Sequence, residues 1–128
     1  MDHLDATVHL GLPADPASIA VVRAVVASVA SRLALAYDAV DDLRIAAAEA
    51  SALLLSSGSE GSRLCVDLQP SDADLHLTIW VEGAAAAPEL ARREGLAWQV
   101  LEGLTDEADV REVNGSPAIE LRLRTVAR

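Results

Sequence analysis

The chain has 128 residues, 52% of them hydrophobic, and a formal net charge of −10 from twenty acidic residues against ten arginines, with no lysine. Such a chain is expected to fold as a single globular domain over residues 1–128 and not to be disordered. Its acidity argues against direct nucleic-acid binding and favours a basic protein partner, and the absence of lysine excludes a Walker A loop.

The N-terminal part is predicted to hold one strand and one long helix. Apolar and polar residues alternate over Ala6–Leu12, which predicts a strand. Asp15 followed by Pro16 is typical of a helix start, with Asp15 as N-cap and Pro16 as the first helical residue. The helix is expected to run to about residue 33, with a core stripe of Ile19, Val22, Val26, Val29 and Leu33.

This first helix is apolar on more than one side. Val21 and Val25 lie on a different face from the core stripe, and Arg23 is the only charged residue between Ile19 and Val26. A helix of this kind is either fully buried or covers a partner as well as its own core, and we expect the second arrangement in a two-layer domain. The guanidinium of Arg23 must then reach solvent or an acidic group of the partner.

A second helix is predicted over Asp38–Leu55. Asp38 is expected to be its N-cap, and Asp41 completes an acidic first turn that suits the helix dipole. Glu49 falls one step off the apolar stripe, so its carboxylate is expected at the edge of the buried face, where a lone glutamate is ordinarily a solvated residue. The stripe itself consists of Val40, Leu43, Ala47, Ala50 and Leu54.

Two hairpins are predicted in the rest of the chain. Arg63–Gln69 and Leu75–Val81 both alternate between apolar and polar residues and are expected to pair with each other. Ala108–Val113 and Ala118–Val126 form the second pair, joined by the turn dipeptide Asn114-Gly115.

Between the hairpins, a third helical pattern runs from Pro88 to about Leu104, with Gly95 as a candidate break. The order is strand, two helices, two strands, a helix and two strands. This clustering predicts an α+β fold, a two-layer α/β sandwich in which helices cover one face of a mixed or antiparallel sheet.

Several kinds of site and location are not expected. No apolar run reaches the roughly 18 residues of a membrane span, and the N-terminus has no basic region followed by an apolar one, so neither a membrane protein nor a secreted one is predicted. A single cysteine, Cys65, cannot form an internal disulfide, which fits the cytoplasm. The three histidines have no partner at metal-ligand spacing, so no metal site is predicted.

Two long segments carry a resemblance to a known family. LPADPASIAVVRAVVASVASRLALAYDAVDDLRIAAAEA and GLAWQVLEGLTDEADVREVNGSPAIELRLR resemble, in order and spacing, the anti-sigma factor serine kinases of sporulation and general stress. The resemblance implies the histidine-kinase-like ATPase fold and a cytosolic regulator that sequesters an alternative sigma factor. It also implies release by an anti-anti-sigma protein, and homodimerisation through the first-helix region. The family places an arginine at the position of Arg23, which implies partner binding there, with Val21 and Val25 as the next candidates.

The nucleotide motifs of that family are only partly present. Glu49 matches the general base of the family, but the position of its magnesium-binding asparagine is Leu53, which offers no oxygen ligand. The adenine-binding Asp-x-Gly-x-Gly box corresponds to Glu82-Gly83 followed by three alanines. Glycines matter there because the backbone approaches phosphate oxygens closely.

The second glycine box is also incomplete. In the family it is Gly-Leu-Gly-Leu; here Gly95 and Leu96 match, while Ala97 and Trp98 replace the other two residues. The connection from residue 84 to residue 94 is too short for the nucleotide lid of the family. We therefore predict that the fold is kept, that ATPase and kinase activity are lost, and that no cofactor is bound. The alternatives are an active serine/threonine kinase that uses ATP and magnesium to phosphorylate its anti-anti-sigma partner, and an interaction domain with another role.

Overall fold

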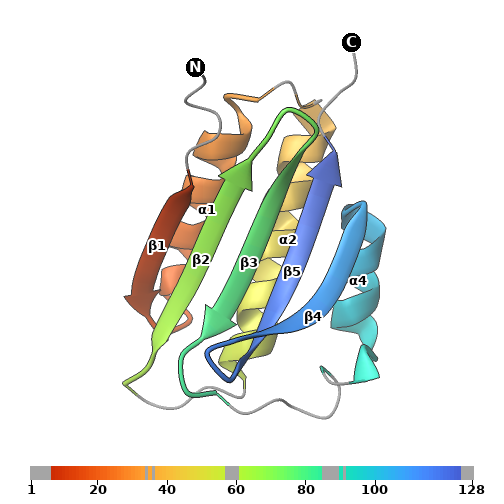
Figure 1. Cartoon of the computed structure of the whole chain (residues 1–128). Coiled ribbons are helices and arrows are strands. Elements are labelled where there is room, and N and C mark those ends of the chain that lie inside the picture. The colour runs from red at the N-terminus through yellow and green to blue at the C-terminus, as the bar shows by residue number, and fades with distance from the viewer. Residues whose placement is uncertain are drawn as a thin grey trace.

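The computed structural model describes residues 7–33, 35, 37–56, 61–84, 90 and 92–124. In chain order, its elements are β1 (Val8–Pro13), α1 (Ser18–Ala30), α2 (Tyr37–Leu55), β2 (Arg63–Pro70), β3 (Asp74–Val81), α4 (Leu96–Leu104), β4 (Glu107–Val113) and β5 (Ser116–Arg124). Figure 1 shows the strands as one twisted sheet in front and these helices together behind it.

The five strands are ordered β1-β2-β3-β5-β4, and every neighbouring pair is antiparallel. The predicted α+β sandwich with helices on one face is thus confirmed, with an antiparallel sheet. Both predicted hairpins are present. In the second, Asn114 and Gly115 have φ angles of 50° and 83°, the left-handed pair that a tight two-residue hairpin needs. No helix among the described residues is long and apolar enough to cross a membrane.

Strand alternation places the main core between the sheet and the helices. In β5, Ile119, Leu121 and Leu123 are buried, while Glu120 and Arg122 point to the other face, as predicted. The helices contribute apolar stripes to the same cluster. Its α2 members are Leu43, Ala46, Ala47, Ala50 and Leu54.

The opposite face of the sheet is not covered by these helices (Figure 1). One register row crosses four of its strands through Gly11, Cys65, Trp80 and Ala118, and the last three form a small buried cluster of their own. Burial raises the pKa of the Cys65 thiol, with the nearby Glu82 carboxylate as the next cause. Around this row the charged side chains pair with one another. These pairs include Arg122–Glu107 at 2.8 Å, His76–Glu120 at 3.1 Å and Arg111–Glu120 at 3.1 Å.

The helix starts differ from the predictions. Helix α2 already includes Tyr37, so Asp38 lies in its first turn and is not the N-cap; the residue before Tyr37 is outside the described residues. Helix α1 begins at Ser18 and not at Pro16, because the preceding turn is closed by i+3 hydrogen bonds, from the Ser18 amide to the Asp15 carbonyl at 2.9 Å and from the Ile19 amide to the Pro16 carbonyl at 3.1 Å. The Asp15 carboxylate caps this turn by accepting a hydrogen bond from the Ala17 amide at 2.8 Å.

Two other boundaries are shifted. Helix α1 ends at Ala30, three residues before the predicted end, and the chain continues as a turn. The third helix does break at Gly95, which stands at the N-cap of α4 with φ 97° and ψ 167°, a conformation essentially restricted to glycine. Its predicted start at Pro88 lies outside the described residues.

Candidate functional site

The outward face of α1 is apolar with one charged side chain. Val22 and Val26 are fully buried against the sheet, whereas Val21 is 43% exposed and Arg23 is exposed. Val25 is half-buried and packs against the main core. Two residues along a helix correspond to about 200° of rotation, so Arg23 lies on the other side of α1 from both valines. A partner that contacts all three must therefore span the outer face of the helix.

Arg23 has no carboxylate partner among the described residues. Helix α1 contains no aspartate or glutamate. Several other arginines pair with carboxylates of the same chain, for example Arg44 with Asp41 at 2.8 Å, whereas Arg63 and Arg124, like Arg23, make no ion pair within the described residues. Arg32, just beyond the end of α1, likewise has no ion pair within the described ranges. The outer side of α1 therefore presents a guanidinium that is free for an acidic group.

Glu49 and Leu53 lie one turn apart on α2, and both are partly buried. Leu53 packs against the main core. The described residues offer Glu49 no hydrogen bond or ion pair, so its carboxylate is not committed to a structural role. The edge position predicted for Glu49 agrees with this partial burial.

Glu82 and Gly83 follow β3 and do not join Glu49. Alternation along β3 sends Val81 into the core under the helices and Glu82 to the opposite face, beside the Cys65 thiol. Gly83 has φ 76° and donates its amide to the Ser116 hydroxyl at 3.1 Å, which fixes the turn after the strand. The structure therefore separates Glu82 from the helix that carries Glu49.

Gly95 and Leu96 begin α4, which packs directly against α2. The conformation of Gly95 is needed for the start of the helix itself, so this glycine has a structural role that is independent of any ligand. Leu96 is 77% exposed. Glu49 and Leu53 on α2, and Gly95 and Leu96 at the start of α4, therefore lie on elements that pack against each other, whereas Glu82 and Gly83 lie in the turn after β3.

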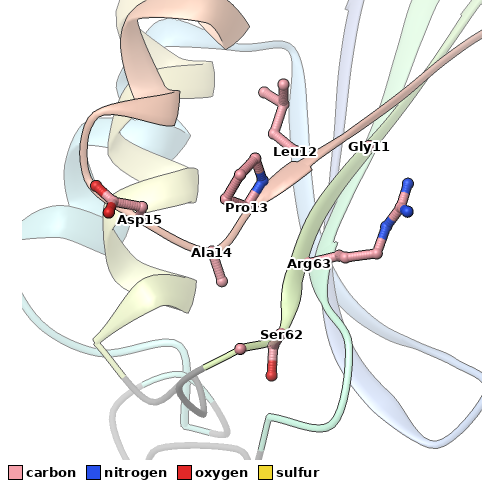
Figure 2. Close-up of a pocket in the computed structure, with 8 residues that line it drawn as sticks. Gly11, Leu12, Pro13, Ala14, Asp15, Ser62 and Arg63 are labelled. Carbon is pink, nitrogen blue, oxygen red and sulfur yellow. The ribbon is translucent and has the colours of Figure 1, made fainter.

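A cavity of about 470 Å³ lies elsewhere, where β1 leads into α1 and the chain enters β2. Figure 2 shows Asp15 and Arg63 extending away from each other on its two sides. A side chain at Gly11 would displace the guanidinium of the exposed Arg63, because an added Cβ would stand 1.9 Å from its nitrogen. None of the predicted site residues lines this cavity. The residues that do are Gly11, Leu12, Pro13, Ala14, Asp15, Gly61, Ser62 and Arg63.

Sequence patterns missed the ion pair between Arg93 and Asp109. Arg93 has φ 55°, unusual for a residue with a side chain, and its Nε donates to Asp109 at 3.0 Å. This hydrogen bond, followed by the one from the Val110 amide, lowers the pKa of Asp109. No local pattern marks the pair, because its members are far apart in the sequence and belong to different elements.

Comparison with known proteins agrees with this architecture. The family model described as the histidine kinase-like ATPase domain matches residues 12–124. The chain belongs to this family.

One solved relative of this histidine kinase-like ATPase domain is the crystal structure of the RsbU and RsbW domains of Rv1364c from Mycobacterium tuberculosis. The two chains superpose with a TM-score of 0.71 at 18% sequence identity, over 96% of this chain and 34% of the other. The chain thus spans about a third of that protein, and at this identity the likeness shows the fold alone. A search of curated proteins found no match.

The family name implies ATP, and the resemblance to the anti-sigma kinases implies a magnesium ion, but the residues matched to those motifs do not fit either group. Leu53 has no oxygen to offer a magnesium ion, and Glu82 faces away from the helices. Trp98 stands in the first turn of α4 and is 1% exposed, packed within the main core. Among the described residues, no group of three or more His, Cys, Asp or Glu side chains could hold a metal ion.

Proposed function

We propose that this domain acts by binding: it sequesters an alternative sigma factor, is countered by an anti-anti-sigma protein, and does so in the cytoplasm without using ATP. Membership of the histidine kinase-like ATPase family supports the proposal at the level of fold. The resemblance of the sequence to anti-sigma kinases supplies the identity of the partners. Homodimerisation through the α1 region is part of the same proposal.

One observation carries the proposal, namely that the exposed Arg23 of α1 has no ion pair among the described residues. An arginine without an intramolecular carboxylate partner is suited to anchor a protein interface, because burial against a partner carboxylate gives it a strong directional contact. Val21 is 43% exposed, and burial of its apolar surface against a partner would be favourable.

The alternative, an active serine/threonine kinase that uses ATP and magnesium on its anti-anti-sigma partner, has one specific observation in its favour. Glu49 is present and partly buried, and its carboxylate has no hydrogen bond or ion pair within the described residues. A general base without its metal ligand does not suffice, because phosphoryl transfer depends on the ion that bridges the phosphates.

Two measurements test the proposal together. The purified chain is titrated with alternative sigma factors and anti-anti-sigma proteins from the same genome, and separately with ATP plus Mg²⁺, both by calorimetry. We expect tight binding of at least one protein and no ATP binding in the micromolar range. Micromolar ATP affinity with transfer of phosphate to the anti-anti-sigma protein would establish the kinase instead. Binding of neither protein class would remove the anti-sigma function.

A further inference from the structure

The two edges of the sheet differ in charge. The strand order places β1 at one edge and β4 at the other. Strand β4 carries the charged residues Glu107, Asp109, Arg111 and Glu112, whereas β1 contains no aspartate, glutamate or arginine. Charged side chains on an edge strand hinder pairing with another chain. The edge at β1 lacks this protection.

The backbone groups on the free side of β1 follow from its pairing with β2. The Ala14 amide donates to the Ser62 carbonyl at 3.0 Å, in continuation of the register between the two strands. In an antiparallel pair, every second residue points its amide and carbonyl toward the partner strand. Counting back from Ala14, the residues that face away from β2 are His9 and Gly11. On that side the described residues provide no further strand.

The Arg63 guanidinium lies beside Gly11 on the face of the sheet that the helices leave open. A Cβ built on Gly11 would stand 1.9 Å from a guanidinium nitrogen, so this side chain occupies the place that the glycine leaves empty. In Figure 2, Arg63 extends from the start of β2 on the side away from Asp15. Both Gly11 and Arg63 line the cavity of about 470 Å³, so the space beside them is open.

The positive charge of Arg63 is not matched by a carboxylate. The side chain is exposed and contacts the Cys65 thiol, but it makes no ion pair with the described residues, including Glu82 near the same thiol. An unpaired guanidinium therefore stands directly beside a strand edge with open backbone groups.

We propose that the free edge of β1 binds an extended, acidic segment of a partner protein as an added strand. The segment exchanges backbone hydrogen bonds with His9 and Gly11, and its carboxylate opposite Gly11 meets the Arg63 guanidinium. The next residue of the segment falls on the helix side, against the half-buried Leu10, and is apolar. A second copy of β1 does not fit this site, because the strand has no carboxylate to offer.

This site is separate from the proposed sigma contact at Arg23 and does not depend on it. The net charge of −10 disfavours an acidic segment at long range, but at physiological salt exposed charges are screened over roughly 8 Å. The local charge of Arg63 then decides the contact.

A synthetic pentapeptide tests the site on the full chain labelled with ¹⁵N. The probe is acetylated Thr-Val-Glu-Val-Thr amide, and we expect it to shift the amide signals of His9 and Gly11 in NMR spectra. The same peptide with Gln in place of Glu should bind at least about fivefold more weakly, because a neutral contact replaces a charge-assisted one. A peptide N-methylated at its Glu keeps the charge but loses a backbone donor, and it should not shift these two amides.

Variants of the chain separate the roles of charge and backbone. Arg63→Gln should weaken binding of the Glu peptide at least about fivefold with an unchanged melting temperature. Arg124→Gln is the matched control, because Arg124 is also exposed and without an ion pair in the described part of the chain, but lies at the end of β5. It should bind the peptide like the parent. Arg23→Ala should also leave peptide binding unchanged, which distinguishes this edge from the α1 interface.

Three outcomes would overturn the proposal. The first is the absence of any shift at His9 and Gly11 with the peptide at millimolar concentration. The second is equal binding of the Glu and Gln peptides, which would remove the acidic segment. The third is a chain that sediments as a dimer and protects these two amides from hydrogen exchange until it is diluted, which would assign the edge to a second copy.

Discussion

Asp109→Asn provides a direct test of how β4 is held to the chain before α4. Asp109 accepts hydrogen bonds from Arg93 Nε at 3.0 Å and from the Val110 amide at 2.8 Å, and Arg111 lies 3.5 Å away. The Asp109 and Arg93 side chains are 34% and 44% exposed, so water screens this ion pair. Its contribution to the free energy of unfolding is expected to be at most about 1 kcal/mol. Since the amide keeps one acceptor but loses the charge, Asp109→Asn should cost about 1 kcal/mol at neutral pH.

The pH dependence of this difference follows from the sign of the pKa shift. The contact with Arg93, and then the Val110 amide, holds the pKa of Asp109 below its ordinary value of 3.8. A carboxyl with a lowered pKa contributes its full stabilisation above the unfolded value and loses it as the pH falls through the folded value. The stability difference between the parent and the variant, measured by urea unfolding, should therefore be the same at about pH 7 and about pH 5, and should shrink only as the pH falls below 3.8 and through the lowered pKa of Asp109.

Glu102→Gln is the matched control, because it also replaces a carboxylate by an amide. Glu102 is exposed on α4 and has no hydrogen bond or ion pair within the described part of the chain. It should give no stability difference at any of these pH values. A parent–variant difference for Asp109→Asn that persists unchanged into acid would refute the reasoning, since it would then come from something other than the carboxylate charge.

Three other changes test the remaining arguments. Arg23→Ala should weaken partner binding at least about tenfold with an unchanged melting temperature, whereas Arg32→Ala should have little effect; equal affinities measured by calorimetry would assign the interface to another face of α1. Glu49→Ala should leave sigma affinity intact and cost within about 1 kcal/mol of stability, and a severe loss of regulation at unchanged affinity would indicate a working kinase. Gly115→Ala, at φ 83°, should destabilise the hairpin by about 1 kcal/mol, while Gly103→Ala in helix α4, with open space around it, should be neutral or stabilising; urea midpoints that move together would contradict this.

The order of the elements could be read from the sequence because each carries its own periodicity. β5 is the clearest case, since Ile119, Leu121 and Leu123 alternate with charged residues that do face the other side. The hairpin turn was equally readable, because Asn-Gly is one of the few dipeptides that adopt two left-handed residues in succession. Helix starts were less predictable, since an aspartate can serve as a cap, as a first-turn residue or as the acceptor of a preceding turn, and only the backbone conformation decides between them.

The relations between candidate site residues depend on contacts that local patterns do not contain. Alternation along β3 places Glu82 and Val81 on opposite faces of the sheet. Only the structure shows that the helices cover the face of Val81, so that Glu82 points away from α2. Burial of Leu90 and the pairing of Arg93 with Asp109 join segments that have no common periodicity. Trp98 was visible as a departure from a motif, and its place in the core could be found only from the packing of α4 on α2.

The total charge of the chain and the local charge of α1 favour different partners. A net charge of −10 favours approach of a basic protein at long range, whereas Arg23, without an acidic neighbour on its helix, favours an acidic group at contact. At physiological salt, exposed charges are screened over roughly 8 Å, so the acidic remainder of the surface affects mainly the rate of encounter. In the proposed complex, the contact itself is decided within that distance, by Arg23 and the exposed residues of the outer face of α1. A partner suited to both effects is a basic protein that presents an apolar segment with a single carboxylate to α1.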